Sequence, residues 1–272
     1  MESFITRRRK DKVVVVVGAT GTGKSRLSID LATRRIVDPN VDFTAADFRH
    51  HASVAIESIA RRDRLPIIAG GSNSYIKALV NDEIDFQSQY ECCFLWVDVS
   101  LPVLYSFVSE RVDRMVAAGM VDEVRRIFNP KADYTRGIRR AIGVPELDRF
   151  LRAESTADEE TRDKLLEAAV REIKANTCKL ARRQLQKIES LQNQFGWNMH
   201  CLDGTEAFIK RGDEADEAWE NQVVERSIMI VDQFLCKDDF MAPITASTSP
   251  SVITKATVLG SASTPAVATA TL

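Results

Sequence analysis

The sequence predicts an α/β fold, a doubly wound parallel sheet with helices on both faces. Five consecutive valines at residues 13–17 are typical of a central parallel strand, which is buried on both sides. Apolar runs at residues 65–69 and 93–99 predict two further strands. Between these runs, apolar residues recur at steps of three and four, the spacing of helices that pack on a sheet. Alternating strands and helices favour parallel pairing.

A glycine-rich loop follows the first predicted strand. It fits the pattern G-x-x-x-x-G-K-[ST] of a phosphate-binding P-loop with Gly18, Ala19, Thr20, Gly21, Thr22, Gly23, Lys24 and Ser25. In such a loop the backbone N–H groups surround a phosphate, the lysine adds positive charge, and the serine hydroxyl binds Mg²⁺. A turn that binds no ligand is the weaker alternative, because an apolar strand precedes the loop and helical spacing follows it. The predicted class is therefore P-loop NTPase-like.

Two long helices are predicted in the second half of the chain. Apolar residues keep helical steps across residues 104–128, which predicts one continuous core helix. A second helix is expected at about residues 158–192, and a helical projection from the sheet at about residues 145–175. The apolar stripe of the second helix consists of Leu166, Val170, Ile173, Thr177, Leu180, Gln184, Ile188 and Leu191.

Basic residues gather in two places. One face of the second long helix carries Arg171, Lys174 and Arg182. A turn around Gly137 contains Arg136, Arg139 and Arg140. Each group fits either a solvated surface or a site that holds the phosphates of a ligand, and spacing alone does not decide between them.

The predicted strand at residues 93–99 carries a carboxylate near its end. Four apolar residues precede Asp98, which resembles the strand whose terminal acid holds Mg²⁺ through water in P-loop proteins. The alternative is that Asp98 caps the helix that starts near Leu101. Both interpretations remain open at this point.

Composition limits the function classes. The 272 residues carry a formal net charge of −2, so no global charge attracts nucleic acid or an anionic membrane. No apolar run is long enough for a membrane helix, and no membrane partner is expected. The five cysteines form no C-x-x-C pair, which predicts neither a zinc site nor a disulfide framework, and we expect them to be core thiols.

The chain divides into three predicted parts: a basic N-terminal segment at residues 1–12, a P-loop domain at residues 13–236, and a tail at residues 237–272. Serine, threonine, alanine and proline dominate the tail, which predicts disorder. The basic cluster at residues 7–10 fits an organellar presequence or a solvated terminus equally well. Plastid and cytoplasm therefore both remain open as locations.

Five motifs occur in one order along the chain. They are the P-loop, the turn at residues 70–75, the helix segment at 111–124, the Arg-Arg-Ala-Ile-Gly segment at 139–143, and the run at 176–184. Together they resemble the isopentenyltransferase family, in particular the plant adenylate isopentenyltransferases of cytokinin synthesis. The tRNA dimethylallyltransferases share the general pattern, but the C-terminal zinc finger that their eukaryotic members often carry has no counterpart here. The adenylate branch is therefore favoured and tRNA is not an expected substrate.

The resemblance implies transfer of a dimethylallyl group from dimethylallyl diphosphate to the N6 amine of ATP, ADP or AMP, with release of pyrophosphate. We expect a monomer that acts on small molecules. The residues expected to hold or neutralise the diphosphate are Thr20, Lys24, Ser25 and Arg140, with Lys174, Arg182 and Arg183 as further phosphate ligands. Mg²⁺ is expected at Ser25 and Asp98.

The chain departs from the family pattern after residue 35. Relatives have a further strand there with an aspartate that is expected to act as the general base for the adenine amine, and this chain lacks that segment. Three hypotheses follow. Another acid, such as Asp98, replaces the base, at a cost in rate that is typically about 10²–10⁴-fold. Alternatively the chain binds diphosphate without turnover, or it is a P-loop small-molecule kinase.

Overall fold

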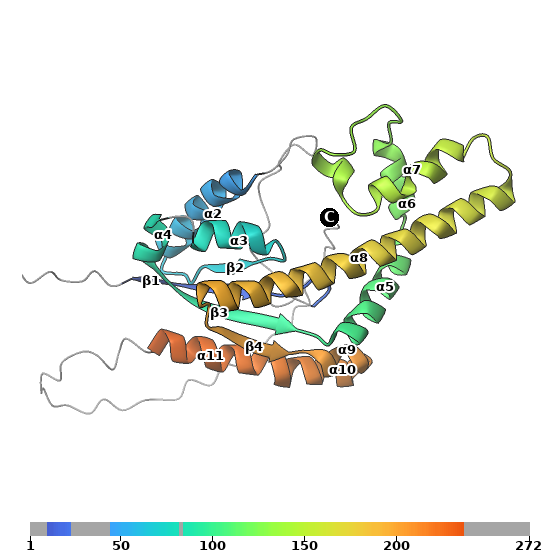
Figure 1. Ribbon diagram of the computed structural model, residues 1–272. Coiled ribbons are helices and arrows are strands. Elements are labelled where there is room, and N and C mark those ends of the chain that lie inside the picture. Colours follow the sequence, from blue (N-terminus) through green and yellow to red (C-terminus); the bar gives the residue numbers. More distant parts are fainter. Residues whose placement is uncertain (1–9, 23–43, 82–83, 237–272) are drawn as a thin grey trace, which may run out of the picture. The chain divides into compact units, whose positions relative to one another are not determined.

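The computed structural model describes residues 10–22, 44–81 and 84–236. Within these residues four strands form one parallel sheet in the order β2-β1-β3-β4 (Figure 1). The strands are β1 Asp11–Val17, β2 Ile67–Ala69, β3 Tyr90–Asp98 and β4 Met199–Asp203. The predicted parallel α/β class is confirmed.

Ten α-helices are described with the sheet. They are α2 Ala45–Ala60, α3 Asn73–Val80, α4 Ile84–Gln89, α5 Leu101–Ala117, α6 Met120–Ile127, α7 Val144–Ala153, α8 Glu159–Phe195, α9 Thr205–Ile209, α10 Gly212–Trp219 and α11 Glu225–Cys236. A 3-10 helix spans Gly137–Arg140, and a π-helical turn spans Glu220–Val224. No helix in the described part of the chain has both the length and the apolar character needed to cross a bilayer.

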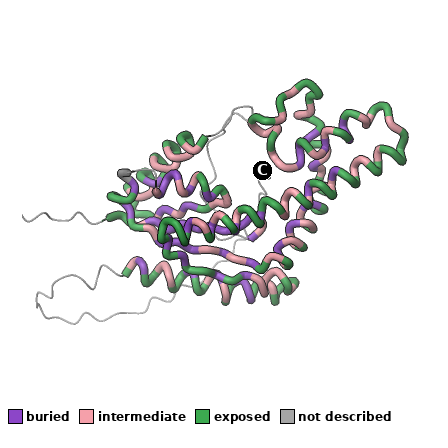
Figure 2. The backbone as a smooth tube through the Cα atoms, in the orientation of Figure 1, coloured by how far each residue is buried: buried purple, intermediate pink, exposed green. Residues whose placement is uncertain are grey.

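Helices pack on both faces of the sheet. Val13, Val15 and Val17 of β1 belong to one core, and Val14 and Val16 belong to the core on the other face. The first core includes Ile56 of α2, Ile76 and Leu79 of α3, and Ile188 and Leu191 of α8. The second includes Leu202 of β4, Trp219 of α10, Val223 of the π-helical turn and Phe234 of α11. Figure 2 shows the central strands as largely buried, as the run of valines predicts.

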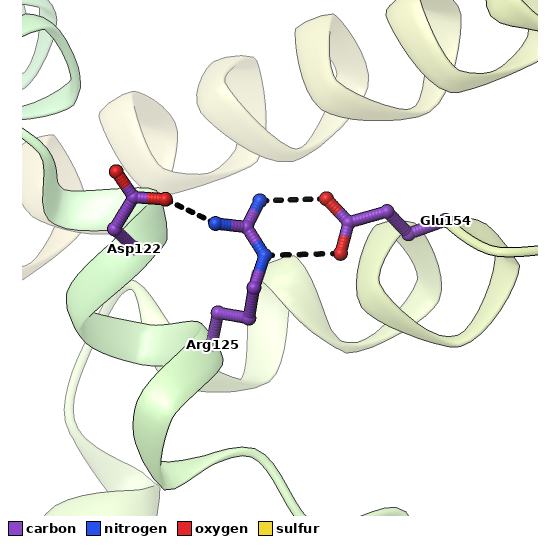
Figure 3. A network of polar contacts seen from close by, with 3 residues as sticks. All are labelled: Asp122, Arg125 and Glu154. Atoms are coloured by element: carbon purple, nitrogen blue, oxygen red, sulfur yellow. Dashed lines mark hydrogen bonds and ion pairs between the residues drawn. The ribbon is translucent and has the colours of Figure 1, made fainter.

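A separate helical layer is built from the second half of α5, from α6 and α7, and from the first half of α8. Its apolar cluster contains Val112, Val124, Leu147, Phe150 and Ile173. The surface of this layer carries a network of ion pairs (Figure 3). The guanidinium of Arg125 donates two hydrogen bonds to the Glu154 carboxylate, at 2.6 and 3.0 Å, and a further one to Asp122. The name helical layer is used from here on for these segments of α5, α6, α7 and α8, together with the 3-10 helix that precedes α7.

The prediction of one helix across residues 104–128 is wrong. The chain instead forms α5 and α6, which are separated at Gly119. This glycine has φ +104°, a left-handed conformation that a residue with a side chain adopts only with strain. The apolar periodicity continues through the break because both helices face the same cluster, so periodicity alone did not reveal it.

The second long helix is confirmed as α8, but its predicted apolar stripe is partly wrong. Leu180 is 36% exposed, whereas Ala181 and Leu185 are buried. A helix has 3.6 residues per turn, so the residue that follows 177 on the same face is either 180 or 181. The prediction chose Leu180, but in α8 the buried residue is Ala181. Alanine is too small to signal this in the sequence.

The expectation that all the cysteines are core thiols is also wrong. Cys93 is buried, but Cys201 and Cys236 are exposed, and Cys92 and Cys178 are half-buried. All five are free thiols. Cys201 is exposed because its strand, β4, is the last strand in the described order of the sheet.

Candidate active site

The predicted P-loop, named the phosphate loop from here on, leaves the carboxyl end of β1, and its described residues, 18–22, turn back on themselves at once. Thr22 is fully buried, and its hydroxyl and backbone N–H both donate to the carbonyl of Ala19, at 3.0 and 3.4 Å. Gly21 has φ +87°, and a Cβ there would lie 2.7 Å from Cγ1 of Val108 in α5. The loop therefore requires glycine at this position for both conformation and space. Gly18 is buried behind it, while Gly23, Lys24 and Ser25 lie outside the described residues.

A second turn lies beside the phosphate loop, at the carboxyl end of β2. The N–H of Gly70 donates to the carbonyl of Val16 at 3.2 Å, which ties this turn to β1. Asn73 opens α3 and is buried. The two turns thus meet at one edge of the sheet, where parallel strands place their carboxyl ends and where α/β proteins bind ligands.

Gln184 of α8 joins the two turns. Its Oε1 accepts a hydrogen bond from the N–H of Thr20 at 2.6 Å, and its Nε2 donates to the carbonyl of Gly71 at 3.0 Å. The Asn73 side chain in turn donates to the Gln184 carbonyl at 3.1 Å. The sequence analysis placed Gln184 in an apolar stripe and missed this role. A polar amide at a core position of a helix was the signal available for it.

Asp98 ends β3 beside the phosphate loop. Its neighbour two residues back, Trp96, pairs with Val17, the last residue of β1. Burial raises the pKa of the Asp98 carboxyl, and the negative charges of Asp203 and Glu189 raise it further, against a hydrogen bond from the N–H of Val99. A carboxylate that is half-buried at the end of a central strand is available to bind a cation.

The alternative that Asp98 caps the next helix is wrong. The N-cap position of α5 is Ser100, whose backbone N–H donates to Oγ1 of Thr205 at 2.9 Å. In the described residues no group of three or more His, Cys, Asp or Glu side chains is arranged to hold a metal ion. Mg²⁺ binding at Asp98 and Ser25 therefore stays a prediction.

The basic residues predicted to share one site are spread along α8. Arg182 and Arg183 are exposed and lie in the same turn as Gln184, beside the phosphate loop. Lys174 lies ten residues earlier, roughly 15 Å along the helix axis. Its ammonium is 2.6 Å from the Asp113 carboxylate of α5, in the helical layer. Arg140 is exposed in the 3-10 helix of that layer.

A cavity of about 570 Å³ opens beside the phosphate loop, a feature that the sequence analysis missed. Gly21 lines it together with Val103 and Phe107 of α5 and Phe208 of α9. The rings of Phe107 and Phe208 meet edge to face, with centroids 4.7 Å apart. Trp219 adds a third aromatic ring to the lining, and the side chains of Glu110, Lys210 and Arg211 also line it, so the wall is mixed apolar and charged. A second cavity, of about 480 Å³, lies around the start of β3, at the end of the strand that is opposite to Asp98.

Comparison with known proteins identifies the family. The model of the family described as IPP transferase matches residues 15–89 and 81–189. The chain belongs to this family. Over 272 aligned residues it is 56% identical to adenylate isopentenyltransferase 5, chloroplastic, of Arabidopsis thaliana, an alignment that covers 85% of this chain and 82% of that protein. It is 49% identical to adenylate isopentenyltransferase 7, mitochondrial, of the same plant, over 83% of this chain and 80% of that protein.

The first alignment also contains a gap in this chain. The alignment is 272 positions long, but it includes only 85% of this chain, which itself has 272 residues. The remaining positions of the alignment are therefore residues of the relative that have no counterpart here. A segment missing from the interior, as the sequence analysis describes, has this effect.

The fold of this IPP transferase has known structural counterparts. A solved structure of a eukaryotic dimethylallyltransferase acting on tRNA superimposes with a TM-score of 0.69, over 89% of this chain and 82% of the other, at 19% identity. At this identity the match concerns the fold alone.

Proposed function

We propose that this protein transfers the dimethylallyl group of dimethylallyl diphosphate to the N6 amine of ATP, ADP or AMP and releases pyrophosphate. The observation that carries the proposal is 56% identity to an adenylate isopentenyltransferase over 82% of that protein's length. The phosphate loop at the carboxyl end of β1 supports it, because the reaction needs a site that binds a leaving diphosphate. The product would enter cytokinin synthesis, of which this is the first step.

The loop would act on the leaving group. As the bond between the prenyl carbon and oxygen breaks, negative charge grows on the diphosphate, and N–H groups fixed in advance stabilise that charge without reorganising. Lys24 would add its charge, and Thr20 would hold the diphosphate from the loop. Arg182 and Arg183, which are exposed in the same turn of α8 as Gln184, would neutralise phosphate oxygens. Arg140 and Lys174 in the helical layer would meet the phosphate tail of the nucleotide.

We propose that Mg²⁺ binds together with the leaving diphosphate. Magnesium is usually held by one or two protein oxygens together with the phosphates of the substrate, so a cage of three protein ligands is not required. Ser25 would hold it directly and Asp98 through a bound water, which leaves the Asp98 carboxylate able to accept a proton. When bound, the ion would supply positive charge to the leaving diphosphate.

The proton of the adenine amine needs an acceptor within this chain. We propose that Asp98 takes this role in place of the aspartate in the missing segment. Its pKa is raised by burial, and the ideal pKa of a general base lies nearer to the working pH than that of an exposed carboxyl. An activity lower than that of the relatives is expected.

The experiment is incubation of the purified chain with Mg²⁺, dimethylallyl diphosphate and each adenine nucleotide, with mass spectrometry of the product. A prenylated nucleotide that disappears in Lys24→Ala supports the proposal. Folded protein that binds diphosphate without product would be a non-catalytic relative, and phosphate transfer from ATP without prenyl donor would identify a kinase. Asp98→Asn removes the proposed base and keeps the shape of the side chain, and Asp163→Asn, at an exposed position of α8, is the control.

We propose a plastid location, because adenylate isopentenyltransferases 5 and 3 of Arabidopsis thaliana, at 56% and 47% identity, are both named chloroplastic, whereas the relative at 49% identity is named mitochondrial. A fluorescent fusion of the whole chain, expressed in plant cells, tests this, and a uniform signal throughout the cytoplasm would contradict it. We also propose that the protein acts as a monomer on small molecules, which light scattering of the purified chain tests.

A further inference from the structure

The amide of Gln184 uses both of its ends to hold two separate loops. Oε1 accepts from the N–H of Thr20 in the phosphate loop, and Nε2 donates to the carbonyl of Gly71 in the adjacent turn. We propose that Gln184 is a positioning residue for the diphosphate: it fixes the phosphate loop against the Gly70–Gly71 turn so that the loop is shaped before the ligand arrives. The inference rests on the proposed function, in which this loop holds a leaving diphosphate.

The chemistry of the two partners fixes the orientation of the amide. A backbone N–H only donates, so the atom facing Thr20 must be the oxygen, and a carbonyl only accepts, so the atom facing Gly71 must be the nitrogen. A flipped amide would set donor against donor and acceptor against acceptor. No other uncharged side chain of similar length offers an acceptor and a donor at its end. Methionine has a similar shape but neither group, so Gln184→Met loses both hydrogen bonds.

The helix that carries Gln184 is itself held firmly. Ala181 and Leu185 are buried against α5, and Ile188, one turn on, is fully buried in the core beneath β1. The Asn73 side chain also donates to the backbone carbonyl of Gln184. The phosphate loop is therefore fixed in position by a rigid helix. The conformational entropy of the loop is lost when the protein folds, so ligand binding does not have to supply that cost.

Gly71 is matched to the Gln184 side chain. A Cβ at residue 71 would lie 2.8 Å from Nε2 of Gln184, closer than atoms that are not bonded approach one another. The atom it meets is the far end of a flexible side chain, so alanine at this position displaces the amide and leaves the backbone in place. Gly71→Ala therefore disturbs the same hydrogen bonds from the opposite side.

The test measures the binding of inorganic pyrophosphate to the full chain in magnesium buffer by calorimetry. Gln184→Met should weaken this affinity roughly tenfold or more, since it removes two hydrogen bonds and leaves a half-buried N–H without its partner. Gln186→Met, an exposed glutamine two residues along the same helix, is the matched control and should bind as the wild type does. In the transferase assay the KM for dimethylallyl diphosphate should rise more than the KM for the nucleotide.

The Gly71→Ala variant keeps the inference falsifiable if Gln184→Met folds poorly. Alone it should weaken pyrophosphate binding, and added to Gln184→Met it should have little further effect, because both act on one set of bonds. Additive losses would overturn the inference. So would a Gln184→Met protein with a lowered Tm and unchanged pyrophosphate affinity, or wild-type protein that does not bind pyrophosphate. Selective loss of pyrophosphate binding without any prenyl transfer by the wild type would support the inference and refute the proposed function.

Discussion

The edge of the sheet at the phosphate loop and the helical layer use polar side chains in opposite ways. At the loop a single neutral amide, Gln184, bonds to two backbone groups in a half-buried position. In the helical layer a guanidinium, Arg125, bonds to two carboxylates at the surface, with 40% of its side chain exposed. One arrangement fixes the backbone where a ligand is expected. The other adds charge to a layer that an apolar cluster already holds together.

The difference teaches where sensitivity to substitution should lie. A half-buried backbone N–H that loses its partner stays largely out of reach of water, so the hydrogen bond is not replaced and the free energy of the folded state rises. An exposed charge that loses its partner is hydrated again and costs little. Substitutions at the sheet edge should therefore change ligand binding. Substitutions on the surface of the helical layer should change stability slightly, and binding not at all.

The largest effect should come from the two apolar cores that support these regions. Ile188→Ala beneath β1 and Leu147→Ala in the helical layer each remove a fully buried side chain, and each should cost about 2–5 kcal/mol of unfolding free energy. Urea unfolding measures the loss. At low temperature, where both variants are folded, Leu147→Ala should still bind pyrophosphate, while Ile188→Ala should bind it weakly because Ile188 lies one turn from Gln184.

Equal loss of pyrophosphate binding in both folded variants would break the comparison, because it would mean that the helical layer shapes the phosphate loop. Ile188→Val, which removes one methylene group, is the graded control. It should cost about 0.5–1.5 kcal/mol and keep most of the binding.

A smaller effect is expected at the break between α5 and α6. Among the described residues no atom lies within 4 Å of a Cβ built at Gly119, so the expected cost of Gly119→Ala comes from its φ of +104°. We expect about 1–3 kcal/mol of destabilisation with pyrophosphate binding unchanged. Gly204→Ala is the control, since its φ is −96° and its nearest contact is an ordinary 3.5 Å. A stable Gly119→Ala variant would mean that the chain accepts the single helix that periodicity predicts.

The sequence predicted the parts of the fold that rest on local pattern. The valines of β1, the P-loop that follows them and the long helix α8 each follow from composition, spacing and glycine placement. Strand β4 was not predicted, because its five residues mix His200 and Cys201 with apolar neighbours and show no clear run. The break at Gly119 was missed because apolar steps continue across it.

At the candidate site the sequence predicted the chemistry better than the arrangement. Lys174 and Arg182 share a helix face in projection, but the rise of the helix separates them, and Asp113 of α5 pairs with Lys174. Gln184 was placed in the right motif and given no role, because its partners are backbone groups of two loops distant in sequence. Contacts of this kind depend on tertiary packing and have no local signature.

The smallest effect is expected at the ion pairs of the helical layer. Arg125→Gln should cost about 0.2–1 kcal/mol at low ionic strength and less in high salt, since the pair is exposed and screened. The neighbouring Arg126→Gln, also exposed, is the matched control and should change stability less. A loss of unfolding free energy above about 2 kcal/mol that salt does not reduce would mean that the Arg125 network contributes as much as a buried interaction, and the contrast with Gln184 would fail.

The pH dependence sharpens this last prediction. The hydrogen bonds from Arg125 lower the pKa of the Glu154 carboxyl in the folded protein. Because the folded pKa lies below the unfolded value of about 4.3, the stabilisation is complete above that pH and is lost as the pH falls through the folded pKa. The difference in unfolding free energy between wild type and Arg125→Gln should therefore be constant from pH 6 to 8 and shrink below pH 4. A difference that persists at pH 2 would show that the arginine acts through the packing of its alkyl chain, because by then the carboxylate has been protonated.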